Sequence, residues 1–323
     1  MKAIVNMVYG SPDVLEYVSV EKPAPTDDEL LIKIHAAGVN AADWRLLRAD
    51  PFLARIEMGL FKPKNKILGA DVAGVVESVG KNVTKFKVGD TVFGDLSGYN
   101  WGSFAEYVCA TENVIAHKPK NLSFEQAAAV PLAAITALQA IRDKGQVQAN
   151  HKVLINGASG GVGTFMLQIA KAFGAEVTAV CSTEKVELVR SLGADHIIDY
   201  KEEDFSQNGK IYDLLVAVNG SRPIREYQRM LTPSGRYICV GGTLMQLFAS
   251  IFLGPLLSIG SKQKLGNVLA KPNHTDLVYL KEMIEKGQLK PIMDRQFDLH
   301  DVPDAIRYIE KGHAKGKVVI RIV

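Results

Sequence analysis

Cysteine is scarce in this chain of 323 residues, which contains only Cys109, Cys181 and Cys239. These cysteines stand far apart and are odd in number, so the sequence offers no disulfide framework of the kind that holds small secreted domains together. Isolated cysteines are typical of a reducing compartment, and we therefore expect a cytoplasmic protein. Met1–Asn6 leads straight into a strand pattern, and we expect no secretory signal there.

An excess of charge is also missing. The 38 Lys and Arg residues nearly balance the 35 Asp and Glu residues, which leaves a net charge of +3. No long basic run occurs, so the sequence gives no support to nucleic-acid binding. With 47% hydrophobic and 23% charged residues, the composition is typical of a soluble globular protein, and the length suggests two domains.

Long uncharged stretches are rare, with one exception. No charged residue occurs between Arg236 and Lys262, and Leu244–Ile259 is strongly apolar. The length would suit a membrane span, but Tyr237–Val240 resembles a sheet strand and Gly254-Pro255 should break any helix. We expect these side chains to be buried against a partner subunit or around a substrate pocket, and peripheral membrane contact is the remaining alternative.

The chain does contain a glycine-rich segment, Asn156–Gly163, between the apolar run Val153–Ile155 and the helical pattern Thr164–Phe173. A strand, a glycine turn and a helix in this order form a cradle for a dinucleotide pyrophosphate, because glycines allow close approach and a helix N-terminus offers N–H groups. The spacing departs from G-x-G-x-x-G, and a tight turn without a ligand is the alternative. The residues expected at the pyrophosphate are Gly157, Ala158, Ser159, Gly160, Gly161 and Val162.

The next strand-like run, Glu176–Val180, indicates which coenzyme the chain prefers. The residues at its tip are Cys181, Ser182, Thr183 and Lys185. An NAD site usually carries a carboxylate here, which binds the ribose 2′-hydroxyl. Two hydroxyls and an ammonium suit a 2′-phosphate instead, and we predict NADPH. Glu184 is expected to point along the following helix. The alternatives are a helix cap for the two hydroxyls and a solvated position for the lysine.

Short strand-like segments separated by Gly, Pro and Asp fill the first third of the chain and predict a barrel-like β domain. They are Ala3–Val8, Glu16–Val20, Glu29–Ala37, Gly69–Val79, Thr91–Phe93 and Glu106–Ala110. Helical patterns follow at Phe124–Val130 and Ala133–Lys144, on either side of Pro131.

From Val153 onwards, strands and helices alternate, which is the pattern of a doubly wound parallel sheet. The predicted strands are Val153–Ile155, Val177–Val180, His196–Ile198, Leu214–Val218 and Arg236–Val240, and the predicted helices are Thr164–Phe173, Glu184–Leu192, Ile224–Met230 and Thr243–Leu253. The segments that we expect to leave this sheet and return to the first domain are Thr275–Lys286, Pro291–Phe297, Val302–Lys311 and Lys317–Val323. We therefore expect an α/β chain with a Rossmann domain over residues 123–271 and a β domain over residues 1–122 and 272–323.

Several segments carry a resemblance to a known family over the whole chain. They are Ala36–Asn40, Gly69–Val76, Phe86–Val92, Ala129–Ala133, Thr136–Leu138, the glycine-rich segment, Leu192–Asp195 and Gly312–Val319. Together they resemble the medium-chain dehydrogenases/reductases, and within them the zinc-free quinone oxidoreductase branch that includes zeta-crystallin and the alkenal/alkenone oxidoreductases. The resemblance implies a GroES-like β domain beside the Rossmann domain.

Zinc alcohol dehydrogenases of this superfamily bind their metal through a Cys and a His at two of these motifs, where this chain has Asn40 and Ala70. Their structural zinc lobe needs four closely spaced cysteines, and the seven histidines here show no ligand spacing. We therefore expect no metal. Reducing a simple carbonyl without a Lewis acid is difficult, whereas an activated alkene or a quinone delocalises the charge that hydride addition creates.

The resemblance thus implies a zinc-independent, NADPH-dependent reductase that transfers hydride to α,β-unsaturated carbonyls (alkenals or alkenones) or to quinones. The alternatives are a one-electron NADPH:quinone reductase and a non-catalytic NADPH-binding redox sensor. We expect a small-molecule enone or quinone as the substrate, no nucleic-acid partner and no membrane span. We also expect a homodimer formed through an edge strand near Asn267–Ala270.

Four residues of the first domain are candidates for the substrate site: Asn40, Asp43, Trp44 and Asp71. Asn40 either donates a hydrogen bond to substrate or coenzyme ribose, or caps a helix over Ala41–Leu47. Asp43 more often caps or pairs than acts as an acid. Trp44 either lines the substrate pocket or packs between the domains. For Asp71 a structural hydrogen bond is favoured over a role in orienting the pocket.

The remaining coenzyme candidates are Thr136, Tyr200, Asn219, Val240, Gly241, Gly242 and Lys317. The resemblance places Thr136 beside the nicotinamide and Tyr200 at the adenine or its phosphate, while a helix back-bond is the alternative for Thr136. Asn219 and Val240–Gly242 lie at the ends of two predicted strands, where open α/β sheets bind ligands. Lys317 can reach the coenzyme, although an ordinary surface lysine is favoured. Tyr99 and Trp101 lie in a glycine-rich loop that either covers a flat substrate or packs as a turn.

Overall fold

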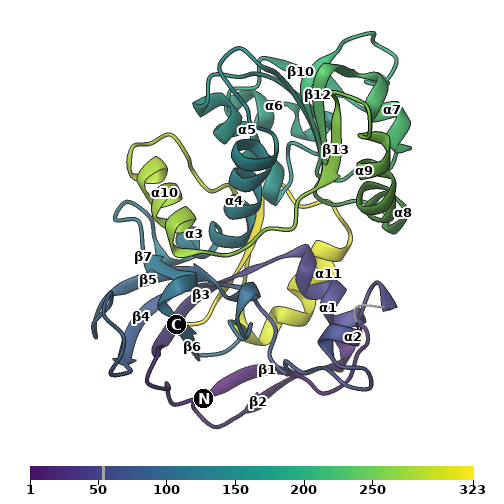
Figure 1. Cartoon of the computed structure of the whole chain (residues 1–323). Coiled ribbons are helices and arrows are strands. Elements are labelled where there is room, and N and C mark those ends of the chain that lie inside the picture. Colours follow the sequence, from purple (N-terminus) through teal and green to yellow (C-terminus); the bar gives the residue numbers. More distant parts are fainter. Residues whose placement is uncertain (53–54) are drawn as a thin grey trace. The chain divides into compact units, whose positions relative to one another are not determined.

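The computed structural model, which describes residues 1–52 and 55–323, has an α/β fold with two compact units (Figure 1). The first unit contains Met1–Ile135, Lys271–Gly287 and Pro291–Val323, and the second contains Thr136–Ala270 and Gln288–Lys290. The expected boundary at residues 122 and 123 precedes helix α3 (Phe124–Ala128), whereas the two units divide within helix α4 (Pro131–Leu138).

The main sheet of the first unit is built around strand β3 (Glu29–Val39). β3 pairs antiparallel with three strands, and its apolar residues are buried on both faces. The sheet order is β14 (Met293–Asp298), β15 (Lys317–Arg321), β3, β4 (Asp71–Val79), β5 (Thr91–Asp95) and β7 (Ile115–His117), and β6 (Tyr107–Thr111) also pairs with β3. β1 (Lys2–Asn6) and β2 (Leu15–Ser19) form a separate two-stranded sheet. The predicted strands and the C-terminal return to this unit are confirmed, and β7 was not predicted.

Helices close this sheet. They are α1 (Ala41–Arg48), α2 (Arg55–Met58), α3, α10 (His274–Glu285) and α11 (Val302–Glu310). The strongly amphipathic α11 buries Val302, Ala305 and Ile306 in one cluster with Val318 and Ile320 of β15. This packing fixes the position of the last strand, and with it Lys317, against β3.

The second unit is a parallel sheet, as predicted. Its strand order is β10 (His196–Asp199), β9 (Glu176–Cys181), β8 (Lys152–Asn156), β11 (Tyr212–Ala217), β12 (Leu231–Cys239) and β13 (Lys264–Asn267). The central strands are apolar and buried, as expected for a sheet that is covered on both faces. The edge strand expected near Asn267–Ala270 lies three residues earlier, as β13, because Lys264 and Gly266 interrupt its short apolar pattern and obscure where it begins.

The helices of this unit are α5 (Gly161–Ala172), the short turn η6 (Thr183–Lys185), α6 (Val186–Ser191) and α7 (Ile224–Arg229). The predicted helix Ala133–Lys144 begins earlier, because Pro131 is tolerated in a first helical turn, and it ends in a π-helical turn η5 (Gln139–Lys144).

The apolar stretch differs from its prediction. It forms α8 (Leu244–Phe248), a π-helical turn η7 (Ala249–Leu253) and α9 (Gly254–Leu257), so Gly254-Pro255 opens a helical turn and does not break one. Figure 1 shows these segments beside β12 and β13. Much of the stretch is exposed in this chain, including Met245 and Phe252. Among residues 1–52 and 55–323, no helix is long and apolar enough to cross a bilayer.

Helix α5 begins in close contact with the turn that follows β8. A Cβ added to Gly163 would lie 2.1 Å from the carbonyl oxygen of Gly157, which is rigid backbone. Any side chain at this position therefore pushes α5 away from the turn. At Gly160 the nearest atom to an added Cβ is 3.7 Å away.

We predict that Gly163→Ala lowers the free energy of unfolding by about 1–3 kcal/mol, since overpacking against backbone is costly. Gly160→Ala is the matched control and should change stability by less than about 1 kcal/mol. Thermal and urea unfolding of both variants measures the difference. Equal stability of the two variants would show that α5 can shift without cost.

Candidate functional site

The carboxyl end of the parallel sheet brings together most of the predicted coenzyme residues. The loops that follow β8, β9, β11 and β12 all leave the sheet at this edge, because the four strands run in the same direction. Open α/β sheets bind ligands outside the carboxyl ends of their strands. The four loops therefore lie at one edge of the sheet, and their role in binding a coenzyme stays a prediction.

The glycine turn is tied to the neighbouring strand and leads directly into α5. Gly157 has a φ of +91°, which favours glycine, and its N–H donates to the carbonyl of Val180 at 3.1 Å. The N–H of Ala158 donates to the same oxygen at 3.2 Å. Gly160 caps the helix and Gly161 begins it, and Ser159 beside them is buried. The N–H groups of the first turn of a helix have no intrahelical partner, so this rigid turn fits a pyrophosphate.

The tip of β9 carries hydroxyl groups at the same edge, and the one carboxylate that follows them is paired with a lysine. Cys181 is buried, and burial raises the pKa of its thiol to about 11, so it is no nucleophile at neutral pH. Ser182 immediately precedes η6 and is buried, whereas Thr183, the first residue of η6, is exposed. The predicted direction of Glu184 is wrong. Its carboxylate lies 2.5 Å from the ammonium of Lys201 after β10, and this hydrogen bond lowers the pKa of Glu184 to about 2.

Residues of three other loops lie near this edge. The exposed Tyr200 follows β10, and its N–H donates to the carbonyl of Cys181 at 3.0 Å. Asn219 follows β11, and its backbone nitrogen would be 3.3 Å from a Cβ added to Gly157. Val240 donates to Ala217, and Gly241 leads to Gly242, which forms a parallel bridge with Gly220.

A buried polar pair at these glycines was missed by the sequence analysis. The side chain of Gln246 donates to the hydroxyl of Tyr237 at 2.7 Å, and its Oε1 is buried without a hydrogen-bond partner. The carboxamide lies against Gly220 and Gly242, where any added Cβ would clash. A buried, unsatisfied acceptor is costly, so this group is a candidate for contact with the coenzyme. The sequence signal that could have revealed it is a single Gln within an apolar stretch that has no charged residue. Thr136, in α4, is also buried.

In the first unit, Lys317 is the centre of a buried polar cluster. Its side chain is 3% exposed, so the expectation of a surface lysine is wrong. Its ammonium lies 2.5 Å from Oδ1 of Asn40, 2.9 Å from Oδ2 of Asp71 and 3.4 Å from the carbonyl oxygen of Val39. These acceptors use all the donors of a lysine. The Asn40 amide also donates to Asp71 at 2.9 Å, and the backbone N–H of Leu132 donates to Oδ1 of Asp71 at 2.7 Å.

The neighbouring candidates support this cluster. The carboxylate of Asp43 accepts hydrogen bonds from the N–H groups of Asn40, at 2.7 Å, and of Gly69, at 3.2 Å. Asp43 therefore has the capping role that the sequence favoured, and burial raises its pKa to about 7. Asn40 precedes α1 as a cap while its side chain belongs to the cluster. Trp44 packs against the apolar core of the first unit that contains residues of α11.

Asp95 is a buried carboxyl that the sequence analysis missed. It lies opposite Asp71 on the neighbouring strand, and its Oδ1 accepts from the N–H of Ser97 at 2.9 Å. Oδ2 is buried without a partner. Burial first, and then the negative charge of Asp71, raise the pKa of Asp95 to about 7. The hydroxyl of Ser103 is also buried and unpaired. Pairing across β4 and β5 revealed Asp95, and no motif marks it.

The loop aromatics and the potential metal ligands lie elsewhere in this unit. The hydroxyl of Tyr99 donates to Glu29 at 2.6 Å and its ring packs on the sheet, so Tyr99 has the role of a packed turn residue. Within the described part of the chain, one group of side chains has metal-ligand proximity, the partly exposed Asp298, His300 and Asp301. Asp298 is engaged by Arg321. Asn40 and Ala70 stand where zinc-dependent enzymes have metal ligands. The side chain of Asn40 is an amide that is bound to the Lys317 ammonium, and that of Ala70 is a methyl group.

We predict that Asp95→Asn stabilises the protein, and increasingly so with pH. A folded-state pKa raised from 3.8 to about 7 means that the folded protein keeps a proton that the unfolded chain loses over this range. The free energy of unfolding of the wild type therefore falls as pH rises from about 4 to about 7. Asn cannot ionise, so the advantage of the variant should grow over this window, by about 1.4 kcal/mol per unit of raised pKa.

Urea unfolding at pH 5, 6, 7 and 8 measures this difference, and Asp298→Asn, which removes an exposed carboxyl, is the control. A gap between Asp95→Asn and wild type that stays constant over these pH values would contradict a buried, proton-retaining Asp95.

Comparisons with known proteins agree with the geometry. Two family models match: the alcohol dehydrogenase GroES-like domain over residues 26–120 and the zinc-binding dehydrogenase over residues 192–320. The 2-methylene-furan-3-one reductase of Solanum lycopersicum is 36% identical, covering 99% of this chain and 79% of the relative. The mitochondrial NAD(P)H oxidoreductase RTN4IP1 of Mus musculus is 32% identical, covering 100% of this chain and 89% of the relative.

Among solved structures, the quinone oxidoreductase from Coxiella burnetii has a TM-score of 0.88 and 30% identity, covering 100% of this chain and 99% of the other. The match extends over both units, and the relatives are oxidoreductases that their names connect with quinones, NAD(P)H or a furanone. This chain therefore belongs to the quinone oxidoreductase branch of the medium-chain dehydrogenase/reductase superfamily, and it is an oxidoreductase that uses a nicotinamide coenzyme.

Proposed function

We propose that the protein is a zinc-independent, NADPH-dependent reductase of α,β-unsaturated carbonyls or quinones. The observation that carries the proposal is the buried ammonium of Lys317, held by Asn40 and Asp71. It supplies a fixed positive charge beside Asn40, one of the two positions at which zinc-dependent members of the superfamily have a metal ligand. The protein thus has a built-in cation there, and Asp71 offsets its charge.

The choice of NADPH is supported by the side chains at the tip of β9. Ser182 and Thr183 offer hydroxyls, Lys185 follows them, and the carboxylate of Glu184 is occupied by Lys201. A 2′-phosphate would meet these hydroxyls and the ammonium groups of Lys185 and Lys201. The carboxylate of Glu184 is already neutralised by Lys201. Gly157–Val162 would hold the pyrophosphate through backbone N–H groups, and Tyr200 would flank the adenine. When bound, the coenzyme supplies the hydride.

The substrate class follows from what the buried cluster can and cannot do. Asn40 is held in one orientation by Lys317 and Asp71, so its amide is a preorganised group for a carbonyl oxygen. The Lys317 ammonium stabilises negative charge that gathers on that oxygen, but it is shared with Asp71. This assistance is weaker than that of a Lewis acid. It suits enones and quinones, whose enolate or hydroquinone products delocalise charge, better than saturated aldehydes.

Solvent is the proposed source of the proton that completes the reduction. Asp43 is committed to two backbone N–H groups, and Asp71 accepts from Lys317, Asn40 and Leu132. These carboxylates are therefore occupied in positioning other groups. Protonation from solvent is sufficient because an enolate is a strong enough base.

A homodimer through the sheet edge remains our proposal for the assembly. β13 is the outer strand of the second sheet. The N–H of Leu265 within it donates to the Ser258 hydroxyl at 2.9 Å, so pairing would use the remaining backbone groups of this edge. An outer strand invites antiparallel pairing with the same strand of a second copy around a two-fold axis. We also propose a reducing, cytoplasmic setting, since Cys109, Cys181 and Cys239 are all free thiols.

The proposal is tested by NADPH oxidation with purified, EDTA-treated protein and three substrates side by side: an alkenone, a naphthoquinone and a saturated aldehyde. We expect turnover of the alkenone or the quinone, with the aldehyde inert. A requirement for added zinc would contradict metal-independent reduction. Saturable NADPH binding without any turnover would favour a redox sensor, and a detectable semiquinone would favour one-electron transfer.

Coenzyme choice gives a separate prediction. Thr183→Asp places an exposed carboxylate at the tip of β9, where it would repel a 2′-phosphate. We expect the Kd for NADPH to rise at least about tenfold, or about 1.4 kcal/mol, while the Kd for NADH stays the same or falls. Thr183→Asn is the control, because Asn has the shape of Asp but no charge. Fluorescence titration measures both constants, and an equal loss for the two coenzymes would refute the assignment.

A further inference from the structure

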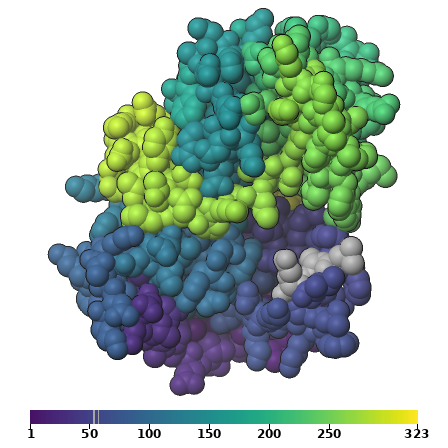
Figure 2. All heavy atoms as spheres, in the orientation of Figure 1, coloured from purple at the N-terminus to yellow at the C-terminus, as the bar shows by residue number. Residues whose placement is uncertain are grey.

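The second unit carries a continuous apolar surface that the chain does not cover. We define the apolar face as the exposed large side chains of α8, η7, α9 and the residues that follow: Met245, Phe248, Ile251, Phe252, Leu253, Leu256 and Ile259. Met245 is 82% exposed and Phe252 is 63% exposed. Phe248 and Phe252 stack with ring centroids 6.2 Å apart. Figure 2 shows the green atoms of this region at the molecular surface.

This exposure is not a failure of the segment to pack. Leu247, Ala249 and Leu257 contact the core of the second unit, and Gln246 and Ser250 are buried. The segment is therefore anchored through one side and apolar on the other. Contiguous exposed apolar surface is uncommon on soluble proteins and marks contact with another molecule or with a membrane.

All charged residues in the stretch of sequence that contains the apolar face, residues 227–275, are basic. No Asp or Glu occurs in the sequence between Glu226 and Asp276, whereas Arg229, Lys262 and Lys264 lie in this stretch. Arg225 precedes it by one residue. These four basic side chains are exposed. The region thus combines apolar side chains with positive charge.

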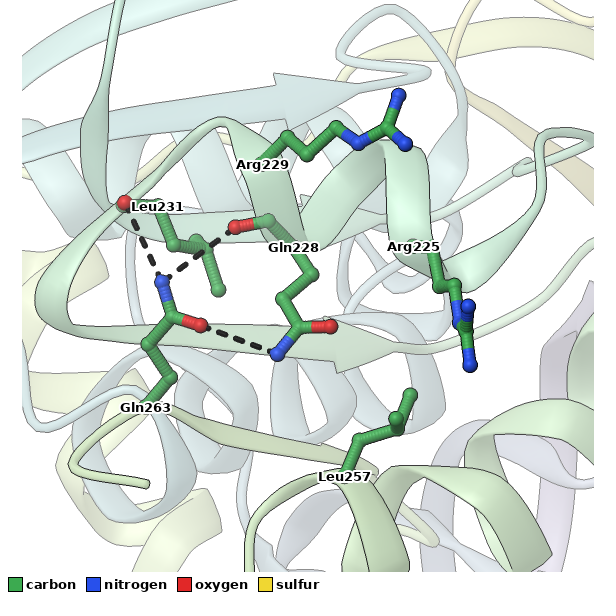
Figure 3. Close-up of a pocket in the computed structure, with 6 residues that line it drawn as sticks. All are labelled: Arg225, Gln228, Arg229, Leu231, Leu257 and Gln263. Atoms are coloured by element: carbon green, nitrogen blue, oxygen red, sulfur yellow. Dashed lines mark hydrogen bonds between the residues drawn. The ribbon is translucent and has the colours of Figure 1, made fainter.

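Two of these arginines line a hollow beside α9. Arg225 and Arg229, four residues apart on α7, share a pocket of about 440 Å³ with Leu257, the neighbour of Leu256. Figure 3 shows α7 with both arginines on one side of this pocket and Leu257 on the other. Gln263 closes a further side, with its amide bonded to the carbonyls of Gln228 and Leu231. The volume of the hollow is sufficient for a phosphate group, and Arg binds phosphate well.

We propose that the apolar face docks on the surface of a membrane that contains anionic phospholipids. The exposed apolar side chains would enter the boundary between headgroups and acyl chains, and Arg225 and Arg229 would contact lipid phosphates. The segments of α8 to α9 are too short to span a bilayer, and they are anchored to the second unit along their length. This inference is independent of the coenzyme and of the substrate.

A second copy of the chain is the less favoured occupant. A two-fold contact would place the same surface against itself, and the basic side chains of both copies would then face each other with no carboxylate in this stretch to pair with. A lipid surface of negative charge satisfies the apolar face and its basic rim together.

The test is cosedimentation of the full-length protein with vesicles of phosphatidylcholine and phosphatidylserine, and with vesicles of pure phosphatidylcholine. We expect binding to the anionic vesicles that weakens with added salt. Phe252→Ser combined with Leu256→Ser should reduce the bound fraction at least about tenfold, because two large apolar side chains no longer enter the interface. Val88→Ser, which removes a side chain of similar exposure (62% against 60% for Leu256) from the first unit, is the control.

A second variant leaves the apolar side chains in place. Arg225→Glu combined with Arg229→Glu should reduce binding to anionic vesicles at least about tenfold, because two attractive contacts with lipid headgroups become repulsive. Lys85→Glu combined with Lys87→Glu makes the same charge change on exposed lysines of the first unit and should bind as the wild type does.

Wild-type protein that binds anionic vesicles no better than neutral ones would overturn the proposal. Sedimentation velocity without lipid tests the rival occupant. If Phe252→Ser with Leu256→Ser dissociates a wild-type oligomer, the apolar face is a contact between copies and the membrane assignment is wrong. A dimer through the backbone of β13 should be unaffected by these substitutions.

Discussion

The structure of the first unit depends on one buried ammonium group. Lys317 starts the last strand of the chain, yet its acceptors come from Val39 and Asn40 near the N-terminal end and from Asp71 on a neighbouring strand. A buried charge is tolerated only when it is paired and fully hydrogen-bonded. The last strand must therefore keep its place beside β3, and the C-terminal segment with β14 and β15 is bound to a sheet whose other strands come from the first 117 residues.

That ammonium group also sets the electrostatics of its surroundings. Asp71 is compensated by Lys317, whereas Asp43 and Asp95 are buried close by with raised pKa values. One positive charge is thus available for several carboxyls, and the cluster avoids excess negative charge by holding protons. A region of this kind can orient a polar substrate without a metal ion, which fits the reductase activity that we propose.

In the second unit, backbone geometry and not a buried charge determines the candidate ligand site. Its parallel strands end at one edge, and the loops there approach one another so closely that glycine is required at Gly157 and Gly163. Elsewhere the same unit leaves apolar side chains of α8 to α9 in solvent, beside basic residues. The strands thus build a ligand edge, while the connection between β12 and β13 provides a separate surface.

The sequence by itself determined the local features: the strand, glycine turn and helix around Gly157–Gly163, the hydroxyls at the tip of β9, and the parallel order of the second unit, because each depends on neighbouring residues and on side-chain periodicity. Only the tertiary structure decided the rest. Lys317 appeared to be a surface lysine, Glu184 turned toward Lys201, and Asp95 went unnoticed. Their roles depend on partners that pairing and packing bring close in space, and no local pattern encodes such a partner.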